Sequence, residues 1–144
     1  MARVKVALPA QFLFSTTIPI RITDLNYGGH LGNDRVLTLV HEARVQFLAS
    51  MGYSEMDMGG VGLIMVDTAI EFKNEVFYGD GVRVSVAAGD FSSVGFDLYY
   101  QLVKEGEVLV AAVKTGMVCY QYGEKRVVRV PEGVRERLLT GVSE

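Results

Sequence analysis

Residues 23–33 read Thr-Asp-Leu-Asn-Tyr-Gly-Gly-His-Leu-Gly-Asn, and the rest of the chain is organised around this stretch. It contains three glycines and one of the two histidines of the protein. Glycines allow backbone N–H groups to approach a ligand closely. A helix that starts directly after them offers unpaired N–H donors at the positive end of its dipole. The stretch is therefore either a plain glycine-rich turn or a place that holds a polarised carbonyl oxygen or a phosphate.

A strand precedes this loop. Three isoleucines at every second position from 18 to 22 predict a strand with one buried face over residues 12–23. Pro19 lacks a backbone N–H, so we expect this strand to lie at a sheet edge or to carry a bulge. The residues before it, Met1 to Gln11, are weakly patterned, and we expect a tail or a short turn there.

A long helix follows the loop. We expect it to begin at Asn33 or Asp34, either of which can cap it, and to stop at Gly52. Apolar residues cover about half of its circumference at 100° per residue, which suits a helix wrapped by a curved sheet. Arg44 falls inside this apolar stripe, so we expect its stem to be buried and its guanidinium to be paired.

The remaining sequence predicts four strands in hairpin-like succession, over residues 62–74, 82–86, 96–102 and 108–121, and a short terminal helix over 131–139. The first of these strands is expected to place Ile64, Val66, Thr68, Ile70 and Phe72 on one face. The last is apolar on both faces in its early part, which indicates a central strand or a subunit interface. One helix and one antiparallel sheet make an α+β fold in a single domain, 1–144, with one sheet face left for water or a partner.

Composition narrows the function classes. The net charge is −3 and no basic tract is present, which argues against a nucleic-acid partner. No apolar run is long enough to span a bilayer, and no signal peptide is evident, so we expect no membrane association and a cytoplasmic location. Cys119 is the only cysteine and lies in an apolar alternating segment, which indicates a core residue rather than a nucleophile.

The motif Asp24-Leu-Asn26-Tyr-Gly-Gly-His30-Leu-Gly-Asn33, followed by Glu42-Ala43-Arg44 on the predicted helix, resembles a known signature. It is similar to that of the hotdog-fold acyl-CoA and acyl-ACP thioesterases of the 4-hydroxybenzoyl-CoA thioesterase type. Glu71-Phe72 and Gly79-Asp80 match the second and third strands of that family, and the resemblance covers about residues 18–121. It implies a curved antiparallel sheet around one long helix. It also implies a homodimer or tetramer that hydrolyses an acyl thioester of CoA or acyl carrier protein (ACP), with no metal and no other cofactor.

The resemblance assigns catalytic roles, with one departure. Asn26 stands where the bacterial enzymes carry a catalytic aspartate. A carboxylate attacks a thioester or takes a proton from water, and a carboxamide does neither. Some acyl-ACP thioesterases of the superfamily pair an asparagine with a histidine. In that arrangement Asn26 orients the substrate or a water, and His30 or Glu42 acts as the base.

The resemblance also implies substrate contacts. Asp24 orients His30 or caps a turn. Gly29 and the N–H groups of Leu31 to Asn33 polarise the thioester carbonyl. Ser92 and Ser93 form a turn that meets the CoA or pantetheine arm. The structural alternatives are a turn-forming Asn26, a helix-capping Asn33, a solvated Glu42 and ordinary turn serines.

Two other functions compete with hydrolysis. The first is a hotdog module that binds acyl-CoA without turnover, and Asn26 is the feature that favours it. The second is the dehydratase branch of the same fold, which uses a histidine and an acidic residue on a comparable helix. The placement of the glycines around His30 fits a thioesterase better.

Overall fold

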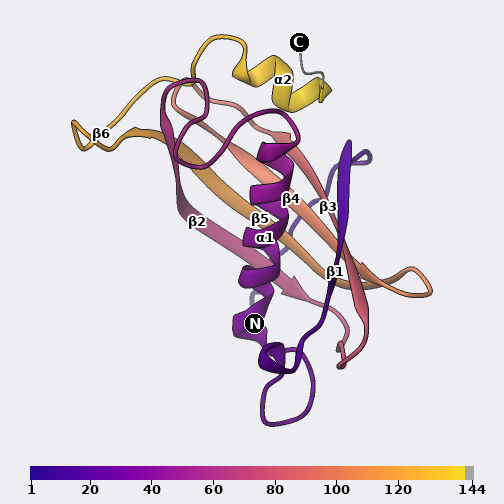
Figure 1. Ribbon diagram of the computed structural model, residues 1–144. Helices are drawn as coiled ribbons and strands as arrows, with labels where there is room; N and C mark the ends of the chain where they lie inside the picture. The colour runs from indigo at the N-terminus through magenta and orange to yellow at the C-terminus, as the bar shows by residue number, and fades with distance from the viewer. Residues whose placement is uncertain (142–144) are drawn as a thin grey trace.

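The computed structural model describes residues 1–141 and shows one long helix lying along the concave side of a curved antiparallel sheet (Figure 1). The helices are η1 (Ile22–Asp24), η2 (Asn33–Arg35), α1 (Val36–Ala49) and α2 (Val134–Thr140). The strands are β1 (Phe14–Pro19), β2 (Gly62–Phe72), β3 (Gly81–Gly89), β4 (Gly95–Lys104), β5 (Val108–Gln121) and β6 (Arg126–Val127). The predicted α+β fold, with a curved sheet wrapped around one long helix, is confirmed.

The strands are ordered β1-β3-β4-β5-β2, and the short β6 also pairs with β5. The predicted central position of β5 is confirmed, because β5 pairs with β4 on one side and with β2 on the other. The expectation of four strands in hairpin-like succession is wrong for β2, which lies beside β5 and not beside β3. Alternating hydrophobicity reports which face of a strand is buried but not which strand is its neighbour.

β1 is shorter than expected. It pairs only with β3, which confirms that Pro19 lies on an edge strand, and it ends at Pro19 rather than at Thr23. The chain then enters the 3₁₀ turn η1, because Asp24 Oδ2 accepts a hydrogen bond from the Arg21 N–H at 2.8 Å. This turn directs the following loop toward the start of α1.

A bulge divides β2. Met65 pairs with Met117 and Asp67 with Gly116, so Val66 is an extra residue on the β2 side. Leu63 is buried. The prediction that Ile64 shares a face with Thr68, Ile70 and Phe72 is wrong, because the bulge lies between them. The single inserted residue reverses the alternation, which explains why a simple period of two failed.

The start of α1 is also different from the prediction. The 3₁₀ turn η2 leads into α1, and neither Asn33 nor Asp34 makes a capping hydrogen bond. The Asp34 carboxylate instead folds back over Gly32, where a Cβ atom would lie 2.4 Å from its Oδ1. The expected stop is consistent with the structure: α1 ends at Ala49, and Gly52 follows with a φ of 80°.

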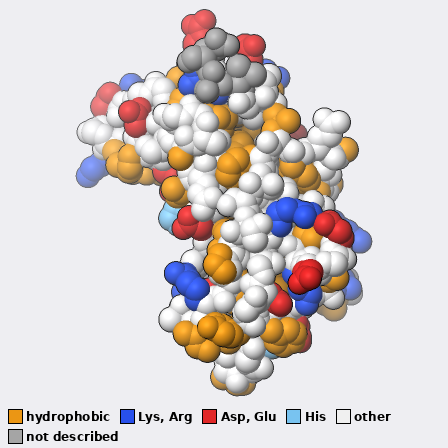
Figure 2. All heavy atoms as spheres, turned by 45° about the vertical axis from the view of Figure 1, so that its right-hand side comes forward, with side chains coloured by type: hydrophobic (Ala, Val, Ile, Leu, Met, Phe, Trp, Pro, Cys, Tyr) orange, Lys and Arg blue, Asp and Glu red, His pale blue; other side chains and the backbone are white. Residues whose placement is uncertain are grey.

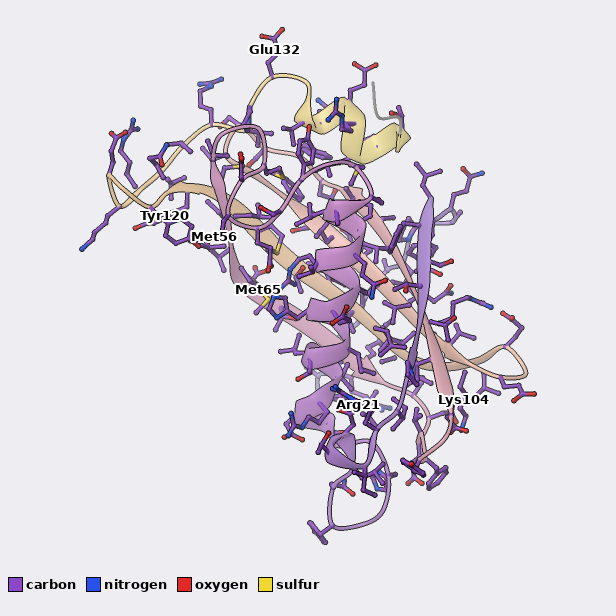
Figure 3. The ribbon with its side chains drawn as sticks, in the orientation of Figure 1. Arg21, Met56, Met65, Lys104, Tyr120 and Glu132 are labelled. Atoms are coloured by element: carbon purple, nitrogen blue, oxygen red, sulfur yellow. The ribbon has the colours of Figure 1, made fainter. Side chains whose placement is uncertain are left out.

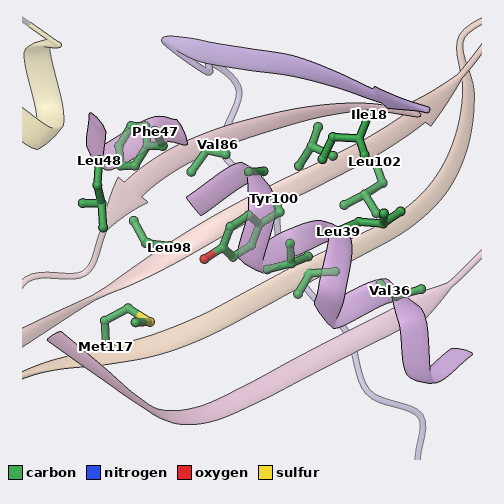
Figure 4. Close-up of a cluster of buried hydrophobic side chains, with 14 of the residues drawn as sticks. Ile18, Val36, Leu39, Phe47, Leu48, Val86, Leu98, Tyr100, Leu102 and Met117 are labelled. Atoms are coloured by element: carbon green, nitrogen blue, oxygen red, sulfur yellow. The ribbon is translucent and has the colours of Figure 1, made fainter. Parts of the chain in front are cut away.

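The core lies between α1 and the sheet (Figure 4). Leu39 and Leu48 of α1 pack among side chains of β3, β4 and β5, and Leu48, Leu98 and Tyr100 have no exposed surface. At the far end of the sheet α2 buries Val134 and Leu138, and its predicted position is confirmed. Among the described residues, no helix has both the length and the apolar character needed to cross a membrane.

The opposite face of the sheet is partly covered by the chain itself. The segment of residues 1–13 crosses this face behind the strands (Figure 1), and the Val6 N–H donates to Glu71 Oε1 at 2.7 Å. Ser85 and Ala112, which point away from α1, are 8% and 3% exposed. The segment expected to be a tail or turn therefore shields part of the surface that we had left for a partner.

Candidate active site

Asn26 closes the loop that presents His30. Its Oδ1 accepts hydrogen bonds from the Gly28 N–H at 2.8 Å and from the His30 N–H at 3.4 Å. Its own N–H donates to the His30 carbonyl at 2.8 Å. Gly29, with a φ of 82°, adopts the left-handed conformation that the turn requires. The side-chain oxygen of Asn26 is thus engaged in shaping the loop.

His30 is fixed against the connection between β2 and β3. Its backbone forms an isolated antiparallel bridge with Phe77, and the Leu31 N–H donates to the Val76 carbonyl at 2.7 Å. The imidazole packs edge-to-face against Phe77, with 6.4 Å between ring centroids, and its Nδ1 lies 3.2 Å from the Leu31 carbonyl oxygen. Since a carbonyl only accepts, Nδ1 carries the proton and Nε2 is the basic nitrogen of the neutral ring.

A cavity of about 610 Å³ opens beside His30. It is formed by the end of the glycine loop, the start of α1, the β2–β3 connection and the adjoining ends of β4 and β5. The lining residues are His30, Leu31, Asn33, Val36, Phe72, Lys73, Asn74, Glu75, Val76, Phe77, Lys104 and Val110. Figure 2 shows hydrophobic side chains gathered around this lower end of the molecule. The cavity thus combines one imidazole, two lysines, one glutamate and two asparagines with apolar residues.

The backbone donors of the loop are mostly used. The Gly29 N–H donates to the Asn26 carbonyl, the Leu31 N–H to Val76 and the Gly32 N–H to the Asp24 carbonyl. The expectation that the amides of Gly29, Leu31 and Gly32 face a substrate carbonyl is therefore wrong. Within residues 1–141 the N–H groups of Asn33 and Asp34 have no acceptor, and they remain the open donors at the helix start.

Asp24 supports this loop from below. It is fully buried, its Oδ2 accepts the Arg21 N–H, and its carbonyl holds Gly32 at 3.1 Å. Its Oδ1 is buried without a hydrogen-bond partner among the described residues. Asp24 is not among the residues that line the cavity beside His30, and within the chain it supports the loop; its predicted role in substrate binding stays a prediction.

The other predicted site residues lie elsewhere. Glu42 accepts a hydrogen bond from Gln46 at 2.8 Å and lines a separate groove of about 400 Å³ between β1 and α1. Ser92 Oγ accepts the Gly95 N–H at 3.1 Å in the β3–β4 turn. The His30 loop adjoins the start of β3, so this turn is roughly 26 Å away, at about 3.3 Å per residue of strand. Within one chain the structure does not bring these residues to His30.

The sequence predicted that the guanidinium of Arg44 is paired, but it did not identify the residues that pair with it. Arg44 Nε donates to Glu55 Oε2 at 2.8 Å, and Arg44 Nη1 donates to the Tyr100 hydroxyl at 3.2 Å. Glu55 also bonds His41 Nε2 at 2.7 Å, and Tyr100 bonds Thr115 at 2.8 Å. Burial opposes the charged form of Glu55, but the hydrogen bonds from Arg44 and His41 prevail and lower its pKa. These partners come from three distant elements, which no local pattern reveals.

Within residues 1–141 no group of three histidine, cysteine or acidic side chains is placed to hold a metal ion. Beside the large cavity lie the His30 imidazole, Glu75, two lysines and the start of the helix at Asn33. An imidazole and an open amide suit acyl transfer to water.

The fold and this site define a thioester hydrolase of the hotdog type. Residues 20–138 match the thioesterase-like superfamily, and the chain belongs to that superfamily. The family and the activity expected from the sequence are thereby confirmed.

Two relatives with assigned functions agree with this class, and a third shares the fold. A 1,4-dihydroxy-2-naphthoyl-CoA hydrolase from Microcystis aeruginosa is 26% identical over 83% of this chain and 88% of its own length. A 1,4-dihydroxy-2-naphthoyl-CoA thioesterase from Synechocystis has a similar structure, with a TM-score of 0.78 and 22% identity over 88% of this chain and 94% of its own. A protein of unassigned function from Thermus thermophilus gives a TM-score of 0.76 and 28% identity over 86% of this chain and 95% of its own.

Proposed function

We propose that this thioester hydrolase acts on an acyl-CoA whose thioester carbonyl is bound by the open N–H groups of Asn33 and Asp34. One observation carries the proposal: the basic imidazole of His30 and the start of the long helix face the same cavity of about 610 Å³. Two donors at a helix start stabilise the oxyanion that forms when the carbonyl is attacked.

In the proposed reaction His30 is the general base. Water attacks the carbonyl carbon while His30 Nε2 takes one of its protons. The tetrahedral intermediate then expels the thiolate, which receives that proton from the imidazolium. The products are the free acid and the thiol. Asn26 acts through the loop: by holding the His30 N–H at 3.4 Å it places the imidazole, and it is a positioning residue.

CoA is the proposed thiol carrier because Lys73 and Lys104 line the same cavity. Lys104 Nζ donates to the Glu75 carbonyl at 2.6 Å and lies 5.7 Å from the centroid of the Phe77 ring, so its position is defined. An ammonium is a compact charge suited to phosphate groups. The relatives from Microcystis aeruginosa and Synechocystis are named as enzymes that act on a CoA thioester. Turnover of acyl-ACP but not of acyl-CoA would contradict this assignment.

We further propose that two copies pair through β2. This strand has neighbours on one side only, and Met65, Val66 and Phe72 are 42%, 58% and 49% exposed. A long exposed edge of this kind is normally covered in native proteins. Antiparallel pairing of β2 with a second β2 reverses the second copy, so its Ser92–Ser93 turn would lie at the His30 end. This pairing supplies a reason for a serine turn to reach the substrate.

We place the enzyme in the cytoplasm. Cys119 is its only cysteine and is buried as a free thiol, which fits a reducing compartment. Fractionation of cells that carry the tagged protein tests this location.

The test of hydrolysis is a pair of variants at His30. We expect His30→Ala to lower kcat on the best acyl-CoA by at least about tenfold, the low end of what a general base supplies. His30→Gln preserves a side chain of similar length and should lose as much, because it does not take up a proton. Circular dichroism verifies that both variants fold. An unchanged rate in either would remove His30 from the mechanism, and binding without turnover in the native protein would favour the non-hydrolytic module.

A further inference from the structure

A smaller hollow of about 260 Å³ lies between α1 and β2, separate from the cavity of His30. Four of its lining residues, Leu37, Thr38, His41 and Arg44, come from α1, and the fifth, Met65, comes from β2. Figure 3 shows Met65 projecting from β2 into the space beside α1. The four residues from α1 have no role in the proposed hydrolysis, and Met65 also lies on the β2 edge proposed to pair two copies.

Arg44 is one of the residues that line this hollow. The Arg44 side chain is 8% exposed, and its Nε and Nη1 donate to Glu55 and Tyr100. A guanidinium has five N–H donors in a planar fork. No residue within 1–141 supplies an acceptor to Arg44 Nη2. Although the side chain as a whole is 8% exposed, Nη2 is not among the buried atoms without a partner, so this donor keeps contact with solvent and can exchange it for an acceptor.

Arg44 already forms an ion pair with Glu55 at 2.8 Å. Glu55 binds both Arg44 and His41, and although burial opposes its charged form, these hydrogen bonds lower its pKa. Arg44 lines the hollow together with the apolar Leu37 and Met65, the hydroxyl-bearing Thr38 and His41. An anion bound to Arg44 there meets no carboxylate among the lining residues.

We propose that this hollow binds a carboxylate attached to an apolar body. The two oxygens of a carboxylate match the fork of Arg44, and charge-assisted hydrogen bonds of this kind are about twice as strong as neutral ones. Leu37 and Met65 contact the apolar part, and His41 and Thr38 lie at the rim. The ligand is either a free organic acid, such as the product of a hydrolysis, or an acyl group that ends in a carboxylate. The site does not depend on the proposed function, because binding is measurable without turnover.

The direct test is a titration of the native protein with benzoate, followed by the NMR signal of the Arg44 side-chain N–H groups. We expect benzoate to shift this signal at millimolar concentration and benzamide, which has the same shape without the charge, to leave it unchanged. Met65→Glu places a carboxylate over the guanidinium and should weaken benzoate binding by at least about tenfold. Met65→Gln, of matched size, should bind within about threefold of the native protein.

Further outcomes distinguish the two sources of the carboxylate. If glutaryl-CoA shifts the Arg44 signal and pentanoyl-CoA does not, the hollow binds the carboxylate end of an acyl group. If only free acids shift the signal, the hollow binds the free acid. Equal benzoate binding by the Met65→Glu and Met65→Gln variants would overturn the proposal. So would a crystal structure in which a second copy of the chain donates the acceptor for Arg44 Nη2. Neither result bears on His30.

Discussion

The structural role of Asn26 can be assigned from the N–H groups whose hydrogen bonds its side-chain oxygen accepts. Its Oδ1 receives the N–H groups of Gly28 and His30, and a carboxylate offers the same acceptors. We therefore expect Asn26→Asp to unfold at the temperature of the native protein and Asn26→Ala to lose about 1 kcal/mol, the usual net worth of such bonds. Thermal denaturation measures both. Equal stability of the alanine variant would show that the loop does not need this acceptor.

Cys119 provides a second test at the scale of one residue. It is fully buried in β5, and burial raises the pKa of its thiol to about 11 from an ordinary value of 9.0. Two pKa units mean about a hundredfold less thiolate at pH 8. We expect the folded protein to react with a thiol-specific dye at least about a hundredfold more slowly than the protein in denaturant. Comparable rates would contradict the assignment of Cys119 to the core.

Single residues were predicted well where their surroundings are local. The pattern of a single strand or helix was enough to predict the edge position of Pro19, the burial of Cys119 and the pairing of Arg44. The partners Glu55, Tyr100 and Thr115 did not, because their proximity is created by tertiary packing. The open amides were misplaced for the same reason: Val76, which takes the Leu31 N–H, lies on a connection between two other strands.

At the scale of elements, Glu55 joins the loop after α1 to the helix. It binds His41 and Arg44, and its backbone carbonyl accepts the Leu63 N–H at the start of β2 at 2.8 Å. Glu55→Gln keeps the shape but removes the charge, so we expect a loss of about 1–2 kcal/mol at pH 7, the range for hydrogen bonds to charged groups less some solvent screening. Chemical denaturation measures this difference.

The pH dependence of that difference has a definite sign. Because the folded pKa of Glu55 is lowered from 4.5, its contribution is complete above pH 4.5 and is lost as the pH falls through the folded value. The gap in stability between the native protein and the Glu55→Gln variant should therefore narrow on acidification below pH 4.5. A gap that stays constant down to pH 3 would mean that the ion pair does not stabilise the loop.

The elements were mostly predictable, and their exceptions have local causes. The helix, the strands over 62–121 and the terminal helix follow from hydrophobic period, and the fold class follows from their order. The bulge at Val66 reversed one face of β2, and no composition signal marks an inserted residue. The neighbour of β2 was missed because it is β5, far along the chain, and closure of a curved sheet decides that pairing.

At the scale of the whole molecule, different segments of the chain pack against the two faces of the sheet. The helix fills the concave side, and residues 1–13 cross part of the other side with Val6 bound to Glu71. A partner that packs flat on that outer face would have to displace this segment. The free edge of β2 carries no such cover within the described chain. Assembly through the edge of β2 is accordingly favoured over stacking of two sheets.

This difference predicts the effect of single charges on assembly. Val66 is 58% exposed at the bulge of β2, and Val127 is 47% exposed on β6, away from that edge. Lysine on an edge strand blocks pairing because its charge must be desolvated. We expect Val66→Lys to be monomeric by light scattering after size-exclusion chromatography, and Val127→Lys to keep the mass of the native assembly. In the proposed pairing the Ser92–Ser93 turn reaches His30 from the second copy, so we expect the monomeric variant also to lose at least about tenfold in kcat/KM for acyl-CoA. A Val66→Lys protein that stays dimeric would place the interface elsewhere, and a fully active monomer would show that one chain completes the site.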